Sequence, residues 1–383
     1  MSALDPAAIP LALYLHFPWC VQKCPYCDFN SHGLRGELPE DAYIDALIRD
    51  LDFELQRPES REITSIFMGG GTPSLFSGRA IGRLLEACAR RLRFAADIEI
   101  TMEANPGTID AGNVRDCRAA GVNRLSIGVQ SLDDAMLKRL GRIHGRGDVE
   151  AAVAAARAAG FDNLNLDLMY ALPQQSEAEA MADLEAAIRL APEHLSYYQL
   201  TLEPNTEFAA RPPPLPDDDA AWVMQLAGQA RLAEAGYAQY EVSAYATAGR
   251  QCRHNRNYWQ FGDYLGIGAG AHGKRTFVDG IERRARHKLP RRYLEAAGSA
   301  DVLQEQRRLG TGELPFEFLM NAFRLDEGHT LPLFVARTGL GTDHLEPRLA
   351  ALAGRGLVEH VDDHWRPTVL GRAHLNTLLA EFL

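Results

Sequence analysis

The sequence has few cysteines, no excess of cations and no long apolar segment, and each shortage excludes a class of protein. Six cysteines in 383 residues, three of them clustered, do not form the disulfide framework of a small secreted protein. The formal net charge of -11 lacks the basic excess with which a general nucleic-acid binder neutralises phosphates. The apolar run after residues 1–10 is too short for a signal peptide or a membrane span. These shortages predict a soluble, cytoplasmic protein.

The chain also lacks internal repeats, and its pattern of strands and helices predicts an α/β fold. Its 383 residues are too many for one ordinary core. Six strand-like segments between residues 11 and 204 alternate with helix-like segments, which indicates β/α units around a parallel sheet. We expect strands at 11–17, 62–70, 97–106, 122–131, 163–173 and 193–204, and helices at 41–56, 79–93, 149–159 and 177–190.

The expected strands alternate apolar and polar residues, which a parallel strand buried on both faces would not do. In the third segment, for example, Glu99, Thr101 and Glu103 alternate with apolar residues. One face therefore packs on helices, and the other is wet or binds a ligand. Six such units predict a partial (β/α)6 TIM-like barrel that stays open on one side and binds ligands at the carboxyl ends of its strands.

The pattern changes after residue 204, and we expect three regions. The barrel occupies 1–210, a linker and barrel-covering segment occupies 211–300, and a C-terminal extension occupies 301–383. The second region begins with a proline-rich connector, continues with a helix at 220–236 and then reads as loops. In the third region, helices, a β-hairpin at 357–368 and a last helix predict a small winged-helix-like α+β domain.

Cys20, Cys24 and Cys27 form a C-x3-C-x2-C run soon after the first expected strand. Three soft sulfur ligands suit iron–sulfur or zinc chemistry, and they leave one position of a metal centre open for a substrate or cofactor. An iron–sulfur centre is favoured over a zinc knuckle completed by His16 or His32, because zinc-binding cysteine pairs usually have the C-x2-C spacing.

A glycine turn, Gly69-Gly70-Gly71-Thr72-Pro73, follows the second expected strand. Glycine permits positive φ and lets the backbone approach a ligand, and the start of the next helix would offer free N–H groups. The alternative is an ordinary tight turn. The motif lacks the lysine of a P-loop, so hydrolysis of nucleotide triphosphates is not expected.

The segments YLHFPWCVQKCPYCDF, GGGTPS and MEANP together resemble the radical S-adenosylmethionine superfamily, and HNRNYW narrows the resemblance to the oxygen-independent coproporphyrinogen oxidase group. The resemblance covers nearly the whole chain from Tyr14 onward. It implies that Cys20, Cys24 and Cys27 hold a 4Fe-4S cluster whose fourth iron binds S-adenosylmethionine. Positions that match contacts to this cofactor are Tyr14, Gly70, Gly71, Thr72 and Glu103, and those that match contacts to a second S-adenosylmethionine are Gln130, Arg142 and Asp167.

Phe29 stands where the oxidases carry a further cysteine, and the CDFN pattern resembles the HemW subgroup of haem chaperones. This resemblance implies that the chain binds haem and hands it to acceptor haemoproteins. His254 of HNRNYW would coordinate the iron, and Tyr258 and Trp259 would offer flat faces to the porphyrin. Alternatives are the oxidative decarboxylation of coproporphyrinogen III and a zinc-stabilised regulatory protein.

One dense basic run, Arg283–Arg292, stands out in this acidic chain. It is either a solvated loop or helix face, or a surface that attracts haem propionates, anionic lipid or an acidic acceptor. Lys274 and Arg275 would extend such a surface.

Overall fold

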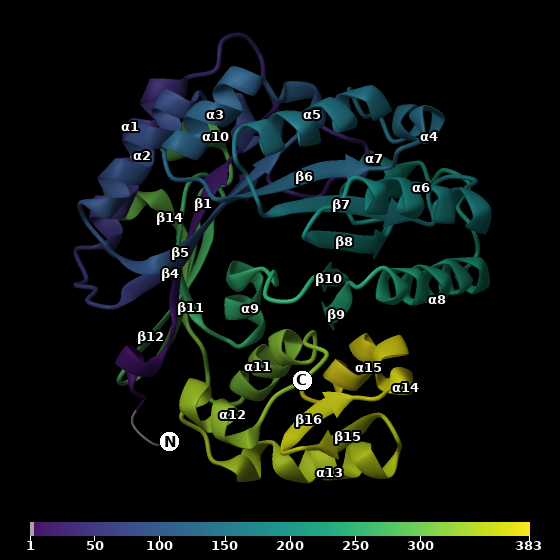
Figure 1. The fold of residues 1–383 in the computed structure, drawn as a ribbon. Coiled ribbons are helices and arrows are strands. Elements are labelled where there is room, and N and C mark those ends of the chain that lie inside the picture. Colours follow the sequence, from purple (N-terminus) through teal and green to yellow (C-terminus); the bar gives the residue numbers. More distant parts are fainter. Residues whose placement is uncertain (1–3) are drawn as a thin grey trace.

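The computed structural model describes residues 4–383 and contains a curved sheet with helices along its outer side (Figure 1). Six neighbouring strands at the centre of the sheet run parallel. They are β1 (Leu11–Phe17), β4 (Glu62–Gly70), β5 (Arg93–Ala104), β6 (Arg124–Gln130), β7 (Leu164–Tyr170) and β8 (His194–Gln199). Each lies beside the next along the chain, as in a TIM-like barrel. All six expected strands are confirmed.

Helices connect these strands and cover the outer face of the sheet (Figure 1). They are α1 (Glu40–Glu54), α2 (Gly78–Ala89), α3 (Ala111–Ala119), α4 (Asp134–Arg139), α5 (Arg146–Ala158) and α6 (Glu177–Arg189). Several begin at a side-chain cap; Ser77 accepts the N–H of Ala80 and Ser176 accepts that of Glu179. The helices expected at 41–56, 79–93, 149–159 and 177–190 are confirmed within a few residues.

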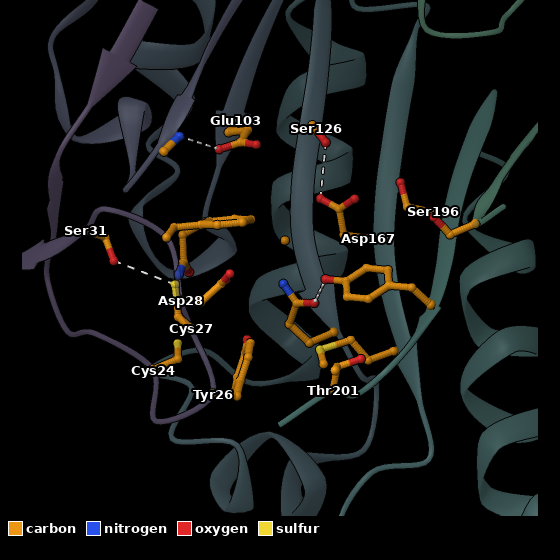
Figure 2. A pocket seen from close by; sticks show the side chains of 18 of the residues that line it. Cys24, Tyr26, Cys27, Asp28, Ser31, Glu103, Ser126, Asp167, Ser196 and Thr201 are labelled. Carbon is orange, nitrogen blue, oxygen red and sulfur yellow. Dashed lines mark hydrogen bonds between the residues drawn. The ribbon is translucent and has the colours of Figure 1, made fainter. Parts of the chain in front are cut away.

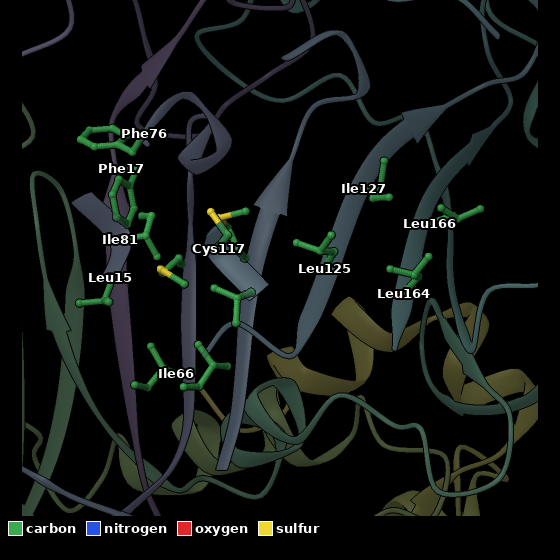
Figure 3. Close-up of a cluster of buried hydrophobic side chains, with 14 of the residues drawn as sticks. Leu15, Phe17, Ile66, Phe76, Ile81, Cys117, Leu125, Ile127, Leu164 and Leu166 are labelled. Carbon is green, nitrogen blue, oxygen red and sulfur yellow. The ribbon is translucent and has the colours of Figure 1, made fainter. Parts of the chain in front are cut away.

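The main core lies between the outer face of the sheet and the helices that cover it. Figure 3 shows some of its side chains along the strands. The members of this core include Leu15, Phe17, Ile66, Phe76, Ile81, Leu125, Ile127, Leu164 and Leu166. The inner face of the same strands carries buried polar side chains, among them Ser65, Thr101, Ser126 and Asn165. The expectation of one apolar and one polar strand face is therefore confirmed.

The sheet is wider than the sequence predicted. Next to β1 lie the parallel strand β11 (Asp263–Ile267) and the antiparallel strands β12 (His272–Phe277), β13 (Gly280–Arg286) and β14 (Leu303–Arg308). Next to β8 lie β10 (Ala244–Ala246) and β9 (Ala238–Glu241). The expectation of loops after residue 236 is therefore wrong. The regional boundaries at 210 and 300 stay a prediction.

The basic run Arg283–Arg292 does not form one surface. Arg284 and Arg286 point into the interior from β13, and Arg286 is 1% exposed. One Nη of Arg286 lies 3.1 Å from Asp50 and 2.7 Å from Glu54, both on α1. The expectation of a membrane-facing or solvated surface is therefore wrong for Arg284 and Arg286. The exposed cations of the run are Lys288, Arg291 and Arg292.

The C-terminal region has a second core, which includes Phe318, Phe334 and Trp365. Its elements are α11 (Leu314–Ala322), α12 (Leu331–Thr338), α13 (Glu346–Gly354), the hairpin of β15 (Val358–Val361) and β16 (His364–Pro367), α14 (Val369–Ala373) and α15 (Leu375–Ala380). The expected order of helices, hairpin and last helix is confirmed. Two helices, α8 (Asp218–Glu234) and α9 (Arg253–Trp259), lie between this region and the barrel (Figure 1). No helix within residues 4–383 is long and apolar enough to cross a membrane.

Candidate functional site

A cavity of ≈ 460 Å³ opens at the carboxyl ends of the parallel strands (Figure 2). Strand ends and the loops that follow them meet at this edge, because all six central strands point the same way. The cavity therefore joins motifs that are far apart in the sequence. The expected site residues that line it are Cys20, Cys24, Cys27, Gly70, Gly71, Thr72, Glu103, Gln130, Arg142, Asp167 and Trp259.

The three clustered cysteines lie in and after the short strand β2 (Trp19–Cys20), and all three are partly exposed free thiols. The loop is compact, since the amide of Cys27 donates to the carbonyl of Cys24 at 3.1 Å. Burial raises the pKa of Cys20 and of Cys27, so metal binding at these sulfurs would release protons. The sulfurs face a cavity large enough for an additional ligand, as an iron–sulfur centre with one open position requires.

His16 is not available for the alternative zinc knuckle. Its Nδ1 shares a hydrogen bond of 2.9 Å with the hydroxyl of Tyr14, and its Nε2 lies 2.9 Å from the carbonyl oxygen of Asn30. Within residues 4–383, no three His, Cys, Asp or Glu side chains gather closely enough to hold a single metal ion. Tyr14, which the resemblance assigns to the cofactor, contacts His16 and does not line the cavity.

Arg142 reaches the cysteine loop from the end of the β6 unit. Its Nη1 donates to Cys24 Sγ at 3.4 Å, and its Nη2 donates to the carbonyl of Gly128 at 2.7 Å. A guanidinium beside a sulfur suits an anionic metal–thiolate centre. Arg142 thus connects the expected cluster loop with the part of the cavity that the resemblance assigns to a second cofactor.

The glycine turn at the end of β4 does not offer free amides. Its N–H groups are used within the protein: Gly70 donates to Glu103 Oε2 (3.0 Å), Gly71 to the carbonyl of Phe17 (2.6 Å) and Thr72 to that of Trp19 (2.8 Å). At the start of the next helix, α2, the amides of Gly78 and Ala80 are also used, by Asn113 Oδ1 (2.6 Å) and Ser77 Oγ (3.2 Å), so the structure does not support the expected free amides there. Gly70 has a φ of +109°, and a Cβ there would lie 2.3 Å from the ring of His16. Glycine is therefore required here by close packing against β1 and the loop that follows it.

Two carboxyl groups, Glu103 and Asp167, lie partly buried in the cavity wall. Burial, with a smaller contribution from the charge of Asp167, raises the pKa of Glu103 to about 8. Burial also raises the pKa of Asp167, although Ser126 Oγ and Asn165 Nδ2 donate to its oxygens at 3.1 and 2.8 Å. Burial makes it unfavourable for these carboxyl groups to carry a negative charge unless a cation lies nearby. A positively charged ligand in the cavity would stabilise their ionised forms.

Gln130 ends β6 in an unusual conformation. Its φ of 70° lies in the left-handed region, which favours glycine. Its Oε1 accepts a hydrogen bond from the hydroxyl of Tyr198 at 2.9 Å, and both residues line the cavity. Backbone strain of this kind is often found at ligand sites. No motif in the sequence indicated Tyr198, although it lies in the expected strand 193–204.

His254 and Tyr258 of the HNRNYW segment do not line the cavity. They lie on α9, and His254 is 1% exposed. Its Nδ1 shares a hydrogen bond with Ser65 Oγ at 3.0 Å, and its Nε2 shares one with the Tyr258 hydroxyl at 2.9 Å. Burial lowers the pKa of His254 to about 3. His254 as a haem ligand stays a prediction, and iron coordination by Nε2 would require the loss of the bond to Tyr258.

Another part of the cavity wall comes from Trp259, which the HNRNYW motif indicated, and from Arg324 and Glu241, which no motif indicated. Trp259 lies at the end of α9, and the guanidinium of Arg324 lies 4.4 Å from the centroid of its ring. Arg324, just after α11, also pairs with Glu241 of β9 at 3.2 Å. These residues come from three separate elements, so only the tertiary structure brings them together.

Comparisons with known proteins agree with this geometry. A family model described as "Radical SAM superfamily" matches residues 14–187, and one described as "HemN C-terminal domain" matches residues 312–374. The solved structure of coproporphyrinogen III oxidase (HemN) from Escherichia coli has a TM-score of 0.82 at 24% identity and covers 98% of this chain and 90% of its own. That likeness shows the fold, a TIM-like radical SAM barrel with a C-terminal extension.

Curated relatives are similar over the full length. The heme chaperone HemW of Escherichia coli (strain K12) is 52% identical over 375 residues, which cover 98% of both chains. The heme chaperone HemW of Haemophilus influenzae is 48% identical, with 99% of both chains covered. The mouse mitochondrial radical S-adenosyl methionine domain-containing protein 1 is 40% identical over 85% of this chain and 76% of its own. The motifs, the fold and these identities agree: the chain belongs to the HemW family of the radical SAM superfamily.

Proposed function

We propose that the protein binds haem and delivers it to acceptor haemoproteins. The observation that carries this proposal is the 52% identity, over 98% of the chain, to a protein named a heme chaperone. Haem and haem-accepting proteins are then its partners. A cytoplasmic location is part of the proposal and is supported by the six cysteines, all of which are free.

The residues of the cavity fit a 4Fe-4S cluster and S-adenosylmethionine. Cys20, Cys24 and Cys27 would hold the cluster, and their sulfurs open into the same cavity as the carboxyl groups of Glu103 and Asp167. Bound there, the pair of cofactors supplies an iron with an open position and one-electron chemistry. The carboxyl groups would bind the positive charges of S-adenosylmethionine, which are on its sulfonium and amino groups.

Phe29 disfavours the alternative function, the oxidation of coproporphyrinogen III. It occupies the position of the further cysteine of the oxidases, it lines the cavity, and its side chain is 57% exposed. A phenyl ring can supply neither a metal ligand nor a proton. The structural likeness to the oxidase is at 24% identity and concerns the fold alone.

Haem transfer by the reconstituted protein tests the proposed function. The full chain, purified and reconstituted without oxygen, should take up haem with a shift of its Soret absorption band. It should then load an apo-haemoprotein faster than haem-loaded serum albumin does, since a delivery protein must release its cargo to an acceptor. No uptake, or transfer no faster than from albumin, would exclude the proposal. Turnover of coproporphyrinogen III in the same preparation would support the alternative.

The affinity for S-adenosylmethionine should rise with pH because of Glu103. Below its pKa of about 8, this carboxyl group is protonated and cannot attract a cation. A charged hydrogen bond contributes about 1.5–3 kcal/mol, so Glu103→Gln should weaken binding roughly tenfold or more above pH 8 and much less at pH 6.5. Isothermal titration calorimetry of the reconstituted proteins measures this difference.

The control for this measurement is Glu86→Gln, on the exposed side of α2, which should follow the wild-type profile. The amino group of the ligand titrates identically in all three proteins, so the comparison isolates the carboxyl group. Parallel pH profiles of wild type and Glu103→Gln would show that Glu103 does not bind the ligand's charge.

A further inference from the structure

A second hollow, of ≈ 620 Å³, lies beside the cysteine loop and opens on the surface. Its walls come from the cysteine loop, from β3 (His32–Gly33), from the segment before α1 and from the start of α10 (Pro290–Ala296). Ser31 lines both this hollow and the cofactor cavity, and its hydroxyl lies 3.7 Å from Cys27 Sγ. The two sites are therefore separated by little more than one side chain. We call this hollow the His32 groove.

His32 has a ring nitrogen that the protein does not use. Its Nε2 is buried and has no hydrogen-bond partner within residues 4–383, and the ring lies near the backbone of Lys288. Burial lowers the pKa of His32, so the imidazole is neutral at physiological pH. A neutral imidazole that keeps one nitrogen free is suited to coordinate a metal. In His254, by contrast, both nitrogens are bonded.

The rest of the groove combines apolar walls with positive charge. Trp19, Leu34 and Pro290 supply apolar surface, while Lys23 and Arg35 are exposed cations of the lining. Glu37 also lines it and is the acidic member of the set. A flat apolar ring with carboxylate groups at one edge matches such a surface, because the ring needs apolar contact and the carboxylates need cations.

We propose that the His32 groove is where this protein binds haem, with His32 Nε2 as ligand of the iron and with Lys23 and Arg35 beside the propionates. The inference rests on the proposed function and locates haem binding in this groove. An open groove suits delivery, because an acceptor protein can reach haem on the surface but not haem inside the barrel. Since Nε2 is covered, the ring must turn outward on binding. The adjacent Gly33 is exposed, and no atom lies within 4 Å of where its Cβ would be, so the backbone next to His32 borders open space.

Haem titration of single-histidine variants tests the assignment. In the anaerobically reconstituted full chain, His32→Ala should bind haem at least tenfold more weakly than wild type and should change the Soret band. His254→Ala should keep wild-type affinity. The matched control is His344→Ala, an exposed histidine of the C-terminal region. Iron content and thermal denaturation of each variant show whether the cluster loop is still folded.

A second pair of variants keeps the test decisive if His32→Ala does not fold. Replacing Lys23 and Arg35 together by glutamine should weaken haem binding several-fold, since both are exposed cations of the lining. Lys23 Nζ also donates to the carbonyl of Phe29 at 3.1 Å, so the iron content of this variant is measured to show that the cysteine loop is intact. The same replacement at Arg90 and Arg93, exposed at the far end of the barrel, should have no effect.

The outcomes separate the two proposals. Absence of haem uptake by wild type would exclude the proposed function. Uptake by wild type with unchanged affinity in His32→Ala, or in the Lys23 and Arg35 variant, would overturn the groove assignment and leave the function intact. Loss of binding in His254→Ala alone would transfer the ligand role to His254.

Discussion

Replacing Cys24 by alanine should abolish the iron–sulfur cluster and leave the chain folded. The residue is partly exposed in the cavity wall, so its removal costs little packing. Two remaining thiolates are too few to hold a 4Fe-4S cluster, which takes its protein ligands from cysteine. After anaerobic reconstitution, the iron content should fall from about four atoms per chain to near zero. Iron and sulfide analysis, together with the EPR spectrum after reduction, measures this loss.

The matched control is Cys117→Ala. Cys117 is fully buried on α3, within the main core, and its change should slightly lower stability without affecting iron content. Binding of S-adenosylmethionine should follow the iron, because the open iron position is part of that site. Full iron content in Cys24→Ala would show that another residue completes the centre, and the assignment of the three cysteines would then be wrong.

The six parallel strands and their helices were predictable because their signals are local. Each strand shows its apolar and polar faces within a few residues, and several helices show a capping residue at the start. The cysteine loop was predictable for the same reason, since Cys20, Cys24 and Cys27 lie close together in the sequence. The proximity of the loop to Glu103 and Asp167 was also predictable, because the carboxyl ends of parallel strands lie at the same edge of the sheet.

The features that the sequence analysis missed depend on contacts between distant segments. The amides of Gly71 and Thr72 donate to the carbonyl groups of Phe17 and Trp19, which lie more than fifty residues earlier in the chain. No local sequence pattern indicates these hydrogen bonds. The environment of His254 depends in the same way on Ser65 of β4. A motif identifies residue types in order, but only the fold decides whether their polar atoms remain free.

The strands β12 and β13 were not predicted from the sequence, because they carry several charged residues. Lys274, Arg275, Arg284 and Arg286 are all less than 10% exposed, although such residues usually mark a surface. Each has an acidic partner: Lys274 pairs with Asp263 at 2.9 Å, and Arg284 pairs with Glu54 at 3.0 Å. These partners lie on other elements, so composition alone could not separate a buried ionic network from a solvated basic surface.

Arg286→Leu should therefore destabilise the protein by about 3–5 kcal/mol, the effect of removing one partner from a buried ion pair. The change would leave Asp50 (0% exposed side chain) and Glu54 (2%) without their shared cation. Because α1 and β13 are far apart in the sequence and are joined by these pairs, the sheet should lose support at β13, next to its edge strand β14. Urea denaturation at neutral pH measures the change, with Arg291→Leu as control. That arginine is 93% exposed and, among residues 4–383, forms an ion pair only with Glu295 of its own helix, so its replacement should have little effect.

Acid should reduce the effect of Arg286→Leu. Burial opposes ionisation of Glu54, but the charges of Arg286 and Arg284 outweigh it and hold the pKa at about 2, below the ordinary value of 4.5. A lowered folded-state pKa means that Glu54 stabilises the wild type fully above pH 4.5 and loses this contribution as the pH falls towards 2. In the variant Glu54 keeps Arg284 and Arg275, so its pKa should rise only in part. Asp50, by contrast, loses the cation it pairs with. Burial already raises the pKa of Asp50, so in the variant its protonation as the pH falls relieves the unpaired charge. The difference in unfolding free energy between wild type and variant should be smaller at pH 4 than at pH 7. A difference that is independent of pH would show that lost packing, and not unpaired charge, destabilises the variant.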